Sequence, residues 1–342
     1  MAGSVTIDNV AAMAGVSIKT VSRVVNKEPN VREKTREKVM EAIKALNYRP
    51  NQSARGLAGR RSYLIGLMYD NPSPSYLANL QAGVLAACQE VSYGLALSPV
   101  NYGDDGLVER VVGWIQQTAI DGVLLTPPLA DSAELVSAIH AEAVPCVVVS
   151  SVGPGWVPAV VIDEKEAARQ MTWHLIDAGH KRIAFIKGHP DHYASQHRFK
   201  GFSEAMEEAG LKVDPELVRQ GYFDFESGKI AAEELLGLSI SPTAVFASND
   251  DMAAGVMHVA HRLKLKIPQD IAVVGFDDTP LSRQVWPSLT TVRQPIRAMG
   301  QCAGELLLRS IGSAAKNNAE PDSSQQLDFE LKFRGSSISG QN

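Results

Sequence analysis

Cysteine is scarce in this chain: its 342 residues include only three, Cys88, Cys146 and Cys302. They lie far apart within apolar segments, and no two of them have the spacing of metal ligands. We therefore expect three buried free thiols in a reducing compartment, with no disulfide framework and no zinc site.

Long apolar runs are missing as well. No stretch approaches the roughly 20 residues that a membrane-spanning helix needs, and the amino-terminal segment has no apolar core of a signal peptide. These absences predict a cytoplasmic protein that does not contact a membrane.

The signatures of common enzymes are also absent. There is no Gly-x-x-x-x-Gly-Lys phosphate loop, no Gly-x-Gly-x-x-Gly turn after a strand and no Gly-x-Ser-x-Gly nucleophile elbow. His189, Asp191, His192 and His197 lie close together, but a metal site needs a fuller ligand set. A solvated loop at the mouth of a cleft is therefore the preferred interpretation. We expect no enzyme activity, no metal and no cofactor.

Charge is present but unevenly distributed. Residues 1–61 hold 12 Lys/Arg and 5 Asp/Glu, a net charge of +7. Residues 62–342 hold the other 21 Lys/Arg and 33 Asp/Glu, a net charge of −12. Only the first segment attracts a polyanion such as DNA, and the rest would be repelled by it.

Two short helical patterns around a tight turn open this basic segment. The first pattern places apolar residues on one stripe, at Ile7, Val10, Ala11 and Ala14. Gly15 supplies the backbone freedom of a sharp turn, and Ser17 is placed to cap the second helix. That helix buries valines and presents a face suited to the DNA major groove, formed by Ile18, Lys19, Ser22, Arg23 and Asn26. A helical hairpin with a solvated basic face is the alternative.

A third helix is expected from Arg32 to Leu46. Its start is weakly capped, because arginine stands where Ser or Asp would accept a backbone hydrogen bond. The following segment, residues 48–61, contains a proline and two glycines and is either a flexible linker or a hinge that folds on DNA. We therefore divide the chain into a headpiece, residues 1–47, this hinge, and a large domain, residues 62–342.

Short apolar strands alternate with amphipathic helices in the large domain. This alternation predicts an α/β domain of two doubly wound units, with parallel sheets covered by helices and ligands at the carboxyl ends of the strands. Strands are expected at residues 64–68, 95–100, 122–126, 146–150, 159–162, 183–187, 244–247, 271–276 and 327–333. Helices are expected at residues 76–91, 107–118, 132–143, 164–178, 199–209, 226–236, 250–263 and 296–310.

Together these segments resemble the LacI/GalR family of bacterial transcription regulators over nearly the whole chain. The motifs that carry the resemblance are Gly15-Val16-Ser17, Thr20 to Asn26, Tyr48 to Leu57, Gly275-Phe276-Asp277-Asp278 and Leu289 to Pro295. The resemblance implies an all-α helix-turn-helix headpiece, a hinge helix and an α/β effector domain of the periplasmic-binding-protein-like type I fold. It implies three crossings between two subdomains, near Ile162, Thr291 and Asp322. Subdomain 1 would hold residues 62–162 and 292–322, and subdomain 2 residues 163–291 and 323–342.

In the headpiece and hinge, the resemblance places DNA contacts. It assigns base reading to Ile18 and Lys19, with Arg23 as a further contact. Leu57 matches a leucine that family members insert between base pairs from the minor groove; a linker leucine touching the effector domain is the alternative. The other residues expected at the DNA are Thr6, Ser17, Thr20, Ser22, Asn26, Tyr48, Asn51, Ala54 and Arg55.

In the effector domain, the resemblance places ligand contacts. Arg198, Asn249 and Asp277 match polar positions that grip a ligand, and Phe223 matches an aromatic position that packs on a sugar ring. A helix cap is an alternative or additional role for Asn249. The remaining candidates are Asp70, Asn71, Tyr76, Thr126, Ser150 and His192.

The expected function is that of a ligand-responsive repressor. A homodimer would bind a pseudo-palindromic operator, and a carbohydrate bound between the subdomains would release it. Within this class, a purine or other corepressor, or a phosphoprotein partner, is the alternative. An alternative outside this class is a cytoplasmic solute-binding protein, which would have the same large domain. The basic headpiece argues against this alternative.

Overall fold

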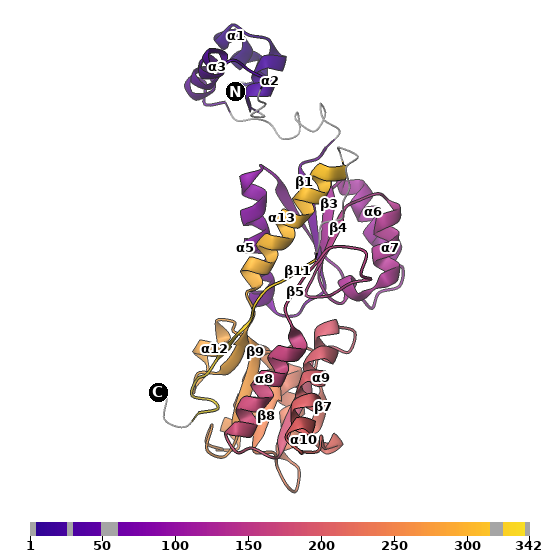
Figure 1. Cartoon of the computed structure of the whole chain (residues 1–342), viewed down its shortest axis with the longest axis vertical. Helices are drawn as coiled ribbons and strands as arrows, with labels where there is room; N and C mark the ends of the chain where they lie inside the picture. Colours follow the sequence, from indigo (N-terminus) through magenta and orange to yellow (C-terminus); the bar gives the residue numbers. More distant parts are fainter. Residues whose placement is uncertain (1–4, 26–29, 49–60, 315–323, 339–342) are drawn as a thin grey trace. The chain divides into compact units, whose positions relative to one another are not determined.

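The computed structural model describes residues 5–25, 30–48, 61–314 and 324–338. The chain divides into two compact units, Met1–Tyr63 and Leu64–Asn342, which are drawn in Figure 1. Each unit is described by itself below.

The first unit is a three-helix headpiece of α1 (Ile7–Ala14), α2 (Ile18–Val25) and α3 (Glu33–Ala45). Gly15 ends α1 in the left-handed conformation, with φ +67°, which confirms the tight turn. The Ser17 hydroxyl accepts a hydrogen bond from the Thr20 amide at 3.2 Å, which confirms the helix cap. Arg32 precedes the first residue of α3 and its side chain does not cap the helix, as expected. The small core contains Val10, Ala11, Val21, Val24, Val39 and Ala42.

The second unit consists of two α/β lobes, each built on a six-stranded sheet. In the first lobe the strand order is β11-β5-β4-β3-β1-β2, and every pairing is parallel. The strands are β1 (Leu64–Tyr69), β2 (Gly94–Pro99), β3 (Gly122–Leu125), β4 (Cys146–Val149), β5 (Ala159–Val161) and β11 (Gln325–Gln326). Helices α5 (Pro74–Glu90) and α13 (Ile296–Ala314) cover one face, and α6 (Leu107–Thr118) and α7 (Ala133–Ala141) cover the other (Figure 1).

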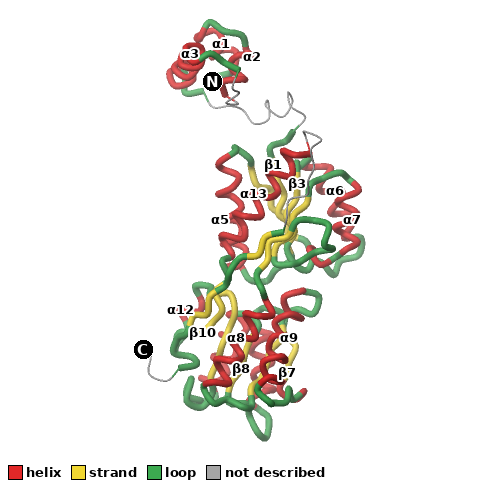
Figure 2. Tube along the Cα trace, in the orientation of Figure 1, coloured by secondary structure: helices red, strands yellow, loops and turns green. Residues whose placement is uncertain are grey.

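The second lobe repeats this arrangement with the order β12-β10-β9-β8-β6-β7. Its strands are β6 (Ile183–Lys187), β7 (Val218–Gln220), β8 (Ala244–Ala247), β9 (Ala272–Asp277), β10 (Thr290–Arg293) and β12 (Glu330–Lys332). Only β12 is antiparallel to its neighbour. The main helices are α8 (Glu164–Asp177), α9 (Tyr193–Glu208), α10 (Phe225–Leu236) and α11 (Asp250–Arg262), with the short α12 (Leu281–Gln284) beside them. Figure 2 shows the strands of both lobes enclosed by helices.

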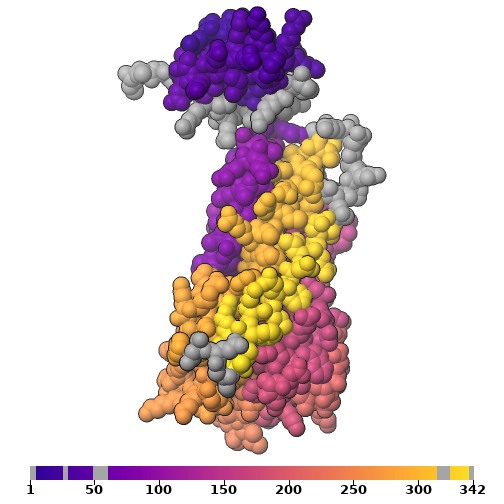
Figure 3. Space-filling model, turned by 60° about the vertical axis from the view of Figure 1, so that its left-hand side comes forward, coloured from indigo at the N-terminus to yellow at the C-terminus, as the bar shows by residue number. Residues whose placement is uncertain are grey.

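Two of the three crossings between the lobes differ from the expectation. The first follows β5, at Ile162. The second follows Arg293 rather than Thr291, because β10 still pairs with β9 in the second sheet. The third lies between Gln326 and Glu330 rather than near Asp322, because β11 pairs with β5 in the first sheet. Figure 3 shows this last segment, in yellow, on the surface of both lobes.

Three short strands, β7, β10 and β11, were not among the expected elements, and α9 begins six residues earlier than expected. These strands have two to four residues and contain Arg, Gln and Thr, so they lack the apolar run that identifies a buried strand.

All three cysteines are free thiols, and burial raises their pKa values, to about 11 for Cys88 and about 12 for Cys146. Cys302 is only half-buried, because α13 turns part of that side chain outward. Within the described ranges, no helix has the length and apolar character to cross a membrane.

Candidate ligand cleft and DNA-binding face

A cleft between the two lobes collects side chains from the carboxyl ends of both sheets. Its empty volume, which includes space open to solvent, is about 420 Å³. Most of its lining lies just after strands, where a doubly wound fold presents ligand contacts. The lining residues are Asn71, Ser73, Tyr76, Pro127, Ser150, His192, Ala194, Arg198, Phe223, Asn249, Asp277 and Gln294.

Arg198 is the cation of this cleft. It projects from α9 with its side chain 5% exposed, and its Nε donates to Oε2 of Glu164 at 2.8 Å. Its Nη1 donates to the carbonyl of Ser248, and its guanidinium lies 3.6 Å from the centre of the Phe276 ring. Burial opposes the charge, but Glu164 and Asp277 outweigh it and raise the pKa of Arg198. The guanidinium is therefore charged and held in one orientation.

Asp277, the last residue of β9, lies opposite this cation. Its Oδ1 is 3.9 Å from Nη1 of Arg198 and accepts a hydrogen bond from Nε2 of Gln294 at 2.6 Å. Its φ of 110° is an unusual backbone conformation for a residue other than glycine. Burial raises the pKa of Asp277 to about 7, despite the nearby Arg198. The carboxyl can therefore gain or lose a proton near neutral pH.

Aromatic and hydroxyl groups form the rest of the lining. Tyr76 and Ser150 share a hydrogen bond of 2.6 Å, and burial raises the pKa of the tyrosine. Ser150 and Phe223 also have positive φ angles, 58° and 64°, so three lining residues other than glycine have an unusual backbone conformation. The rings of His192 and Phe223 lie 5.2 Å apart. Burial lowers the pKa of His192 to about 3 and keeps it neutral.

Asn249 serves as a helix cap while lining the cleft. Its Oδ1 accepts from the Met252 amide at 2.9 Å, at the start of α11, and its Nδ2 donates to the Phe223 carbonyl at 2.8 Å. The capping role is therefore confirmed. The bond from Nδ2 also fixes the backbone of Phe223 beside α11.

Two hydrogen bonds join the lobes across the cleft. The Ser73 hydroxyl donates to Oδ2 of Asp251, and the Tyr193 amide donates to Oδ2 of Asp131, both at 2.9 Å. Each pairs a residue of the first lobe with one of the second, so each depends on the angle between the lobes.

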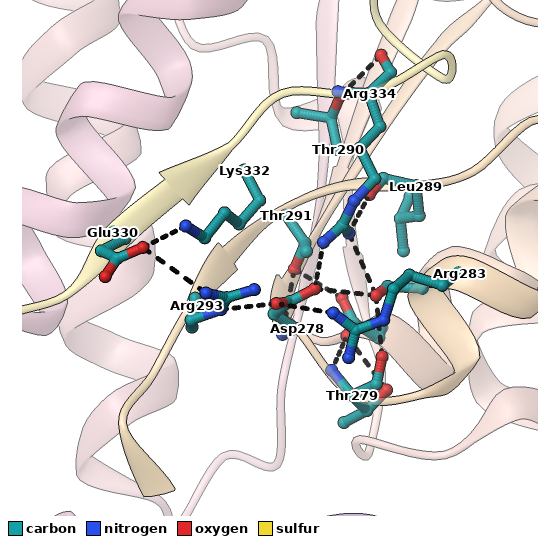
Figure 4. A network of polar contacts seen from close by, with 12 residues as sticks. Asp278, Thr279, Arg283, Leu289, Thr290, Thr291, Arg293, Glu330, Lys332 and Arg334 are labelled. Atoms are coloured by element: carbon teal, nitrogen blue, oxygen red, sulfur yellow. Dashed lines mark hydrogen bonds and ion pairs between the residues drawn. The ribbon is translucent and has the colours of Figure 1, made fainter. Parts of the chain in front are cut away.

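Behind Asp277, a network of charged groups connects the second and third crossings (Figure 4). Asp278, whose side chain is 1% exposed, accepts from Arg334 at 2.5 Å and from Nε of Arg293 at 2.7 Å. Arg293 also lies 3.6 Å from Glu330 of β12. The end of the strand at Asp277 is thereby bonded both to the segment that leaves for the first lobe and to the segment that returns from it.

The headpiece presents a polar face on α2. Ile18 is 48% exposed, so it is not packed inside the headpiece, and Lys19 beside it is also exposed. Ser22 and Arg23 are half-buried. The hydroxyls of Ser17 and Thr20 share a hydrogen bond of 2.9 Å.

Two further DNA-contact candidates lie at the ends of the headpiece. The Thr6 amide donates to Asn9 at 2.8 Å, before the first turn of α1. Tyr48 packs against the headpiece core, and its pKa is raised by burial and by Asp8. The remaining candidates, Asn26, Asn51, Ala54, Arg55 and Leu57, lie outside the described residues.

Comparison with known proteins assigns both units. Residues 6–51 match the family model "Bacterial regulatory proteins, lacI family", and residues 172–337 match a "Periplasmic binding protein-like domain". The chain is 37% identical to Catabolite control protein A of Priestia megaterium over 97% of this chain and 99% of that protein. It is 37% identical to the transcriptional repressor PurR of Vibrio cholerae over 90% and 91%. The chain belongs to the LacI family.

Solved structures of LacI-family members agree with this assignment. A complex of the regulator CelR with cellobiose aligns with a TM-score of 0.74 and 33% identity over 97% of this chain and 99% of that chain. The Lac repressor dimer bound to operator and an anti-inducer aligns with a TM-score of 0.81 and 29% identity over 98% and 100%. This LacI-family protein is a ligand-responsive, DNA-binding regulator of transcription.

Eight of the ten ligand-contact candidates of this LacI-family regulator line one cleft. The other two do not: Asp70 accepts a hydrogen bond from the Tyr102 amide at 2.8 Å, and Thr126 is completely buried, with Pro127 taking its place in the lining. His192 is 5% exposed, so the solvated-loop interpretation is wrong for this residue. Across the described ranges, no group of three or more His, Cys, Asp and Glu side chains could hold a metal ion.

Sequence reasoning missed two polar residues of the cleft, Ser73 and Gln294. Gln294 directly follows β10, so recognising that short strand would have placed it at a strand end. Ser73 precedes Pro74 at the start of α5, a helix-start signal that points to the same edge of the sheet. For Glu164, which accepts a hydrogen bond from Arg198, the sequence predicts a place in a helix but no role at the cleft.

Proposed function

We propose that the ligand of this regulator is a carbohydrate that acts as an inducer and lowers affinity for the operator. The observation that carries the proposal is the cluster of Arg198, Asp277 and Gln294 beside Phe223. Fixed groups of this kind can bond neighbouring sugar hydroxyls, while an aromatic ring covers the apolar face of a sugar. One solved relative, CelR, is a complex with cellobiose.

The ring pair of His192 and Phe223 is not spaced to hold a purine between its two rings. A flat base held between two rings needs them roughly parallel and about 7 Å apart, which is two contact distances. The rings of His192 and Phe223 are 5.2 Å apart and inclined by 46°. A purine would have to force them apart, although the PurR relatives keep this ligand class as the second candidate.

Titration calorimetry of the full chain tests this proposal. The panel is glucose, cellobiose, maltose, hypoxanthine and guanine. We expect a sugar to bind, and we expect Phe223→Ala to weaken that binding. The exposed Phe333→Ala is the matched control and should bind like the wild type. Binding of purines alone would contradict the proposal.

We also propose that the regulator acts as a cytoplasmic homodimer on a pseudo-palindromic operator. Both lobes expose large apolar side chains: Leu85 and Leu97 are 41% and 44% exposed, and Tyr222 and Trp286 are 47% and 71% exposed. Contiguous apolar patches, rather than single side chains, mark subunit interfaces, so the most exposed of these residues is the one to test. A Trp286→Glu variant should dissociate in light-scattering measurements, and an unchanged mass would show that this side chain is not at the interface.

A further inference from the structure

The ligand cleft has one cationic side chain, and its positive charge is balanced by a carboxylate of the protein. Among the described residues that line the cleft, Arg198 is the only lysine or arginine. Its partner Glu164 is as deeply buried as Arg198 itself, with side-chain exposures of 3% and 5%. Their 2.8 Å contact is therefore shielded from water. Opposite charges interact more strongly in such a buried place than at the surface.

Glu164 occupies a particular place in the chain. It is the first residue of α8, immediately after the first crossing between the lobes. From there its carboxylate reaches Arg198 on α9 and satisfies the Nε group that would otherwise be free for a ligand. The Ser248 carbonyl takes Nη1 of the same guanidinium. Much of the capacity of Arg198 to bind an anion is thus used within the protein.

The oxygen atoms around this pair cannot donate a hydrogen bond to an anion. Oε1 of Glu164 and Oε1 of Gln294 are buried, and neither has a hydrogen-bond donor among the described residues. Asp277 adds a second carboxyl group 3.9 Å from Arg198. The group as a whole has one positive charge against two carboxyls, and its two buried atoms without a partner are acceptors that suit hydroxyl donors.

We propose that Glu164 determines the charge specificity of the cleft: it cancels the charge of Arg198 and thereby excludes phosphorylated and other anionic ligands. This inference rests on the proposed carbohydrate effector and narrows it to uncharged sugars. A phosphate that loses the attraction of an uncompensated cation about 4 Å away binds more weakly on the order of 100- to 1,000-fold.

The test measures thermal unfolding of the full chain in sodium phosphate and in sodium chloride of equal ionic strength. Glu164→Gln keeps an oxygen acceptor for Arg198 but removes the negative charge. We expect phosphate to raise the melting temperature of this variant by about 2–4 °C more than that of the wild type. Glu166→Gln is the matched control, because Glu166 lies on the same helix and pairs with Arg169 near the surface.

Two results would overturn the proposal. One is a phosphate response of Glu164→Gln no larger than that of Glu166→Gln. The other is a wild type that phosphate stabilises as much as Glu164→Gln. A Glu164→Asp variant retains the charge and should respond like the wild type; a response like that of Glu164→Gln would refute the role of charge.

If Glu164→Gln does not fold, a ligand titration of the wild type alone still tests the proposal. Calorimetric titration of the wild type with glucose 6-phosphate and ribose 5-phosphate should show no binding, and binding of either would refute the exclusion. Purine binding in the ligand panel would remove the carbohydrate proposal. It would leave the role of Glu164 intact, because the phosphate response depends only on the charge of the cleft.

Discussion

Replacing Asp278 by Asn tests how strongly the charge network behind the cleft stabilises the crossings between the lobes. The wild-type carboxylate is nearly inaccessible and accepts bonds from Arg334, Arg293 and the Ser282 hydroxyl. Asparagine has nearly the same size but only one acceptor oxygen, and its amide would face an arginine donor. Arg334, whose side chain is 15% exposed, would then lose its nearby counter-charge.

The expected cost follows from the burial of each partner. A hydrogen bond between charged groups contributes about 1.5–3 kcal/mol. The buried bond to Arg334 should contribute about 1.5–3 kcal/mol. Arg293 is 40% exposed, so its bond should add less than about 1 kcal/mol. Asp278→Asn should therefore lower the free energy of unfolding by about 2–4 kcal/mol, and the melting temperature by about 5–12 °C.

Thermal unfolding followed by circular dichroism measures this effect. Asp104→Asn is the matched control, because it breaks an Asp–Arg contact of 3.1 Å in which both side chains are 47% exposed. This control should lose less than about 1 kcal/mol. Equal losses in the two variants would refute the reasoning.

Acid gives a second check on the same network. Burial raises the pKa of Asp278, but the bonds from Arg334, Arg293 and Ser282 outweigh it and lower the pKa below its ordinary value. Its contribution is therefore fully present above the ordinary pKa and is lost as the pH falls through the lower folded-state pKa. The difference between wild type and Asp278→Asn should stay constant from about pH 7 to about pH 4 and shrink only below that, as the pH falls through the folded-state pKa. A difference that stays constant below about pH 4 as well would contradict this explanation.

Three further predictions concern ligand and DNA. Because the pKa of Asp277 is about 7 in the free cleft and sugar hydroxyls favour the ionised carboxylate, ligand affinity should fall about tenfold from about pH 8 to about pH 6. Calorimetry should find no such slope for Asp277→Asn. Leu57→Ala should weaken operator binding strongly in gel-shift assays and leave ligand binding unchanged; equal operator affinity would remove the wedge role. Lys19→Ala should relax base preference at one operator position, and an unchanged preference would show that Lys19 does not read a base.

The sequence predicts the architecture well where long patterns carry it. The buried strands Ile183–Lys187 and Ala244–Ala247 have the bounds expected from their apolar runs. The turn at Gly15 and the cap at Ser17 follow from local backbone chemistry. Short strands such as β10 have too few apolar residues to be recognised, which is why the second and third crossings were misplaced.

For the cleft, the strand-end rule and the family motifs located most of the lining. They could not foresee that the side chain of Asp70 turns to the Tyr102 amide, since that bond depends on a neighbouring loop. Nor could they pair Glu164 with Arg198, because the two lie on different helices and meet only in the folded lobe. Residue type and spacing predict which edge of a sheet forms a site, whereas the partner of each charge depends on packing.

Operator binding with and without ligand tests the central claim most directly. A duplex selected by the full chain from a random-sequence library is labelled and titrated by fluorescence anisotropy, first without ligand and then with the sugar that binds in the calorimetric panel. The account predicts a two-fold pseudo-palindromic duplex whose affinity falls by roughly 5- to 150-fold when the cleft is saturated, in line with a coupling of about 1–3 kcal/mol. Unchanged affinity for DNA while calorimetry shows the sugar bound would contradict it.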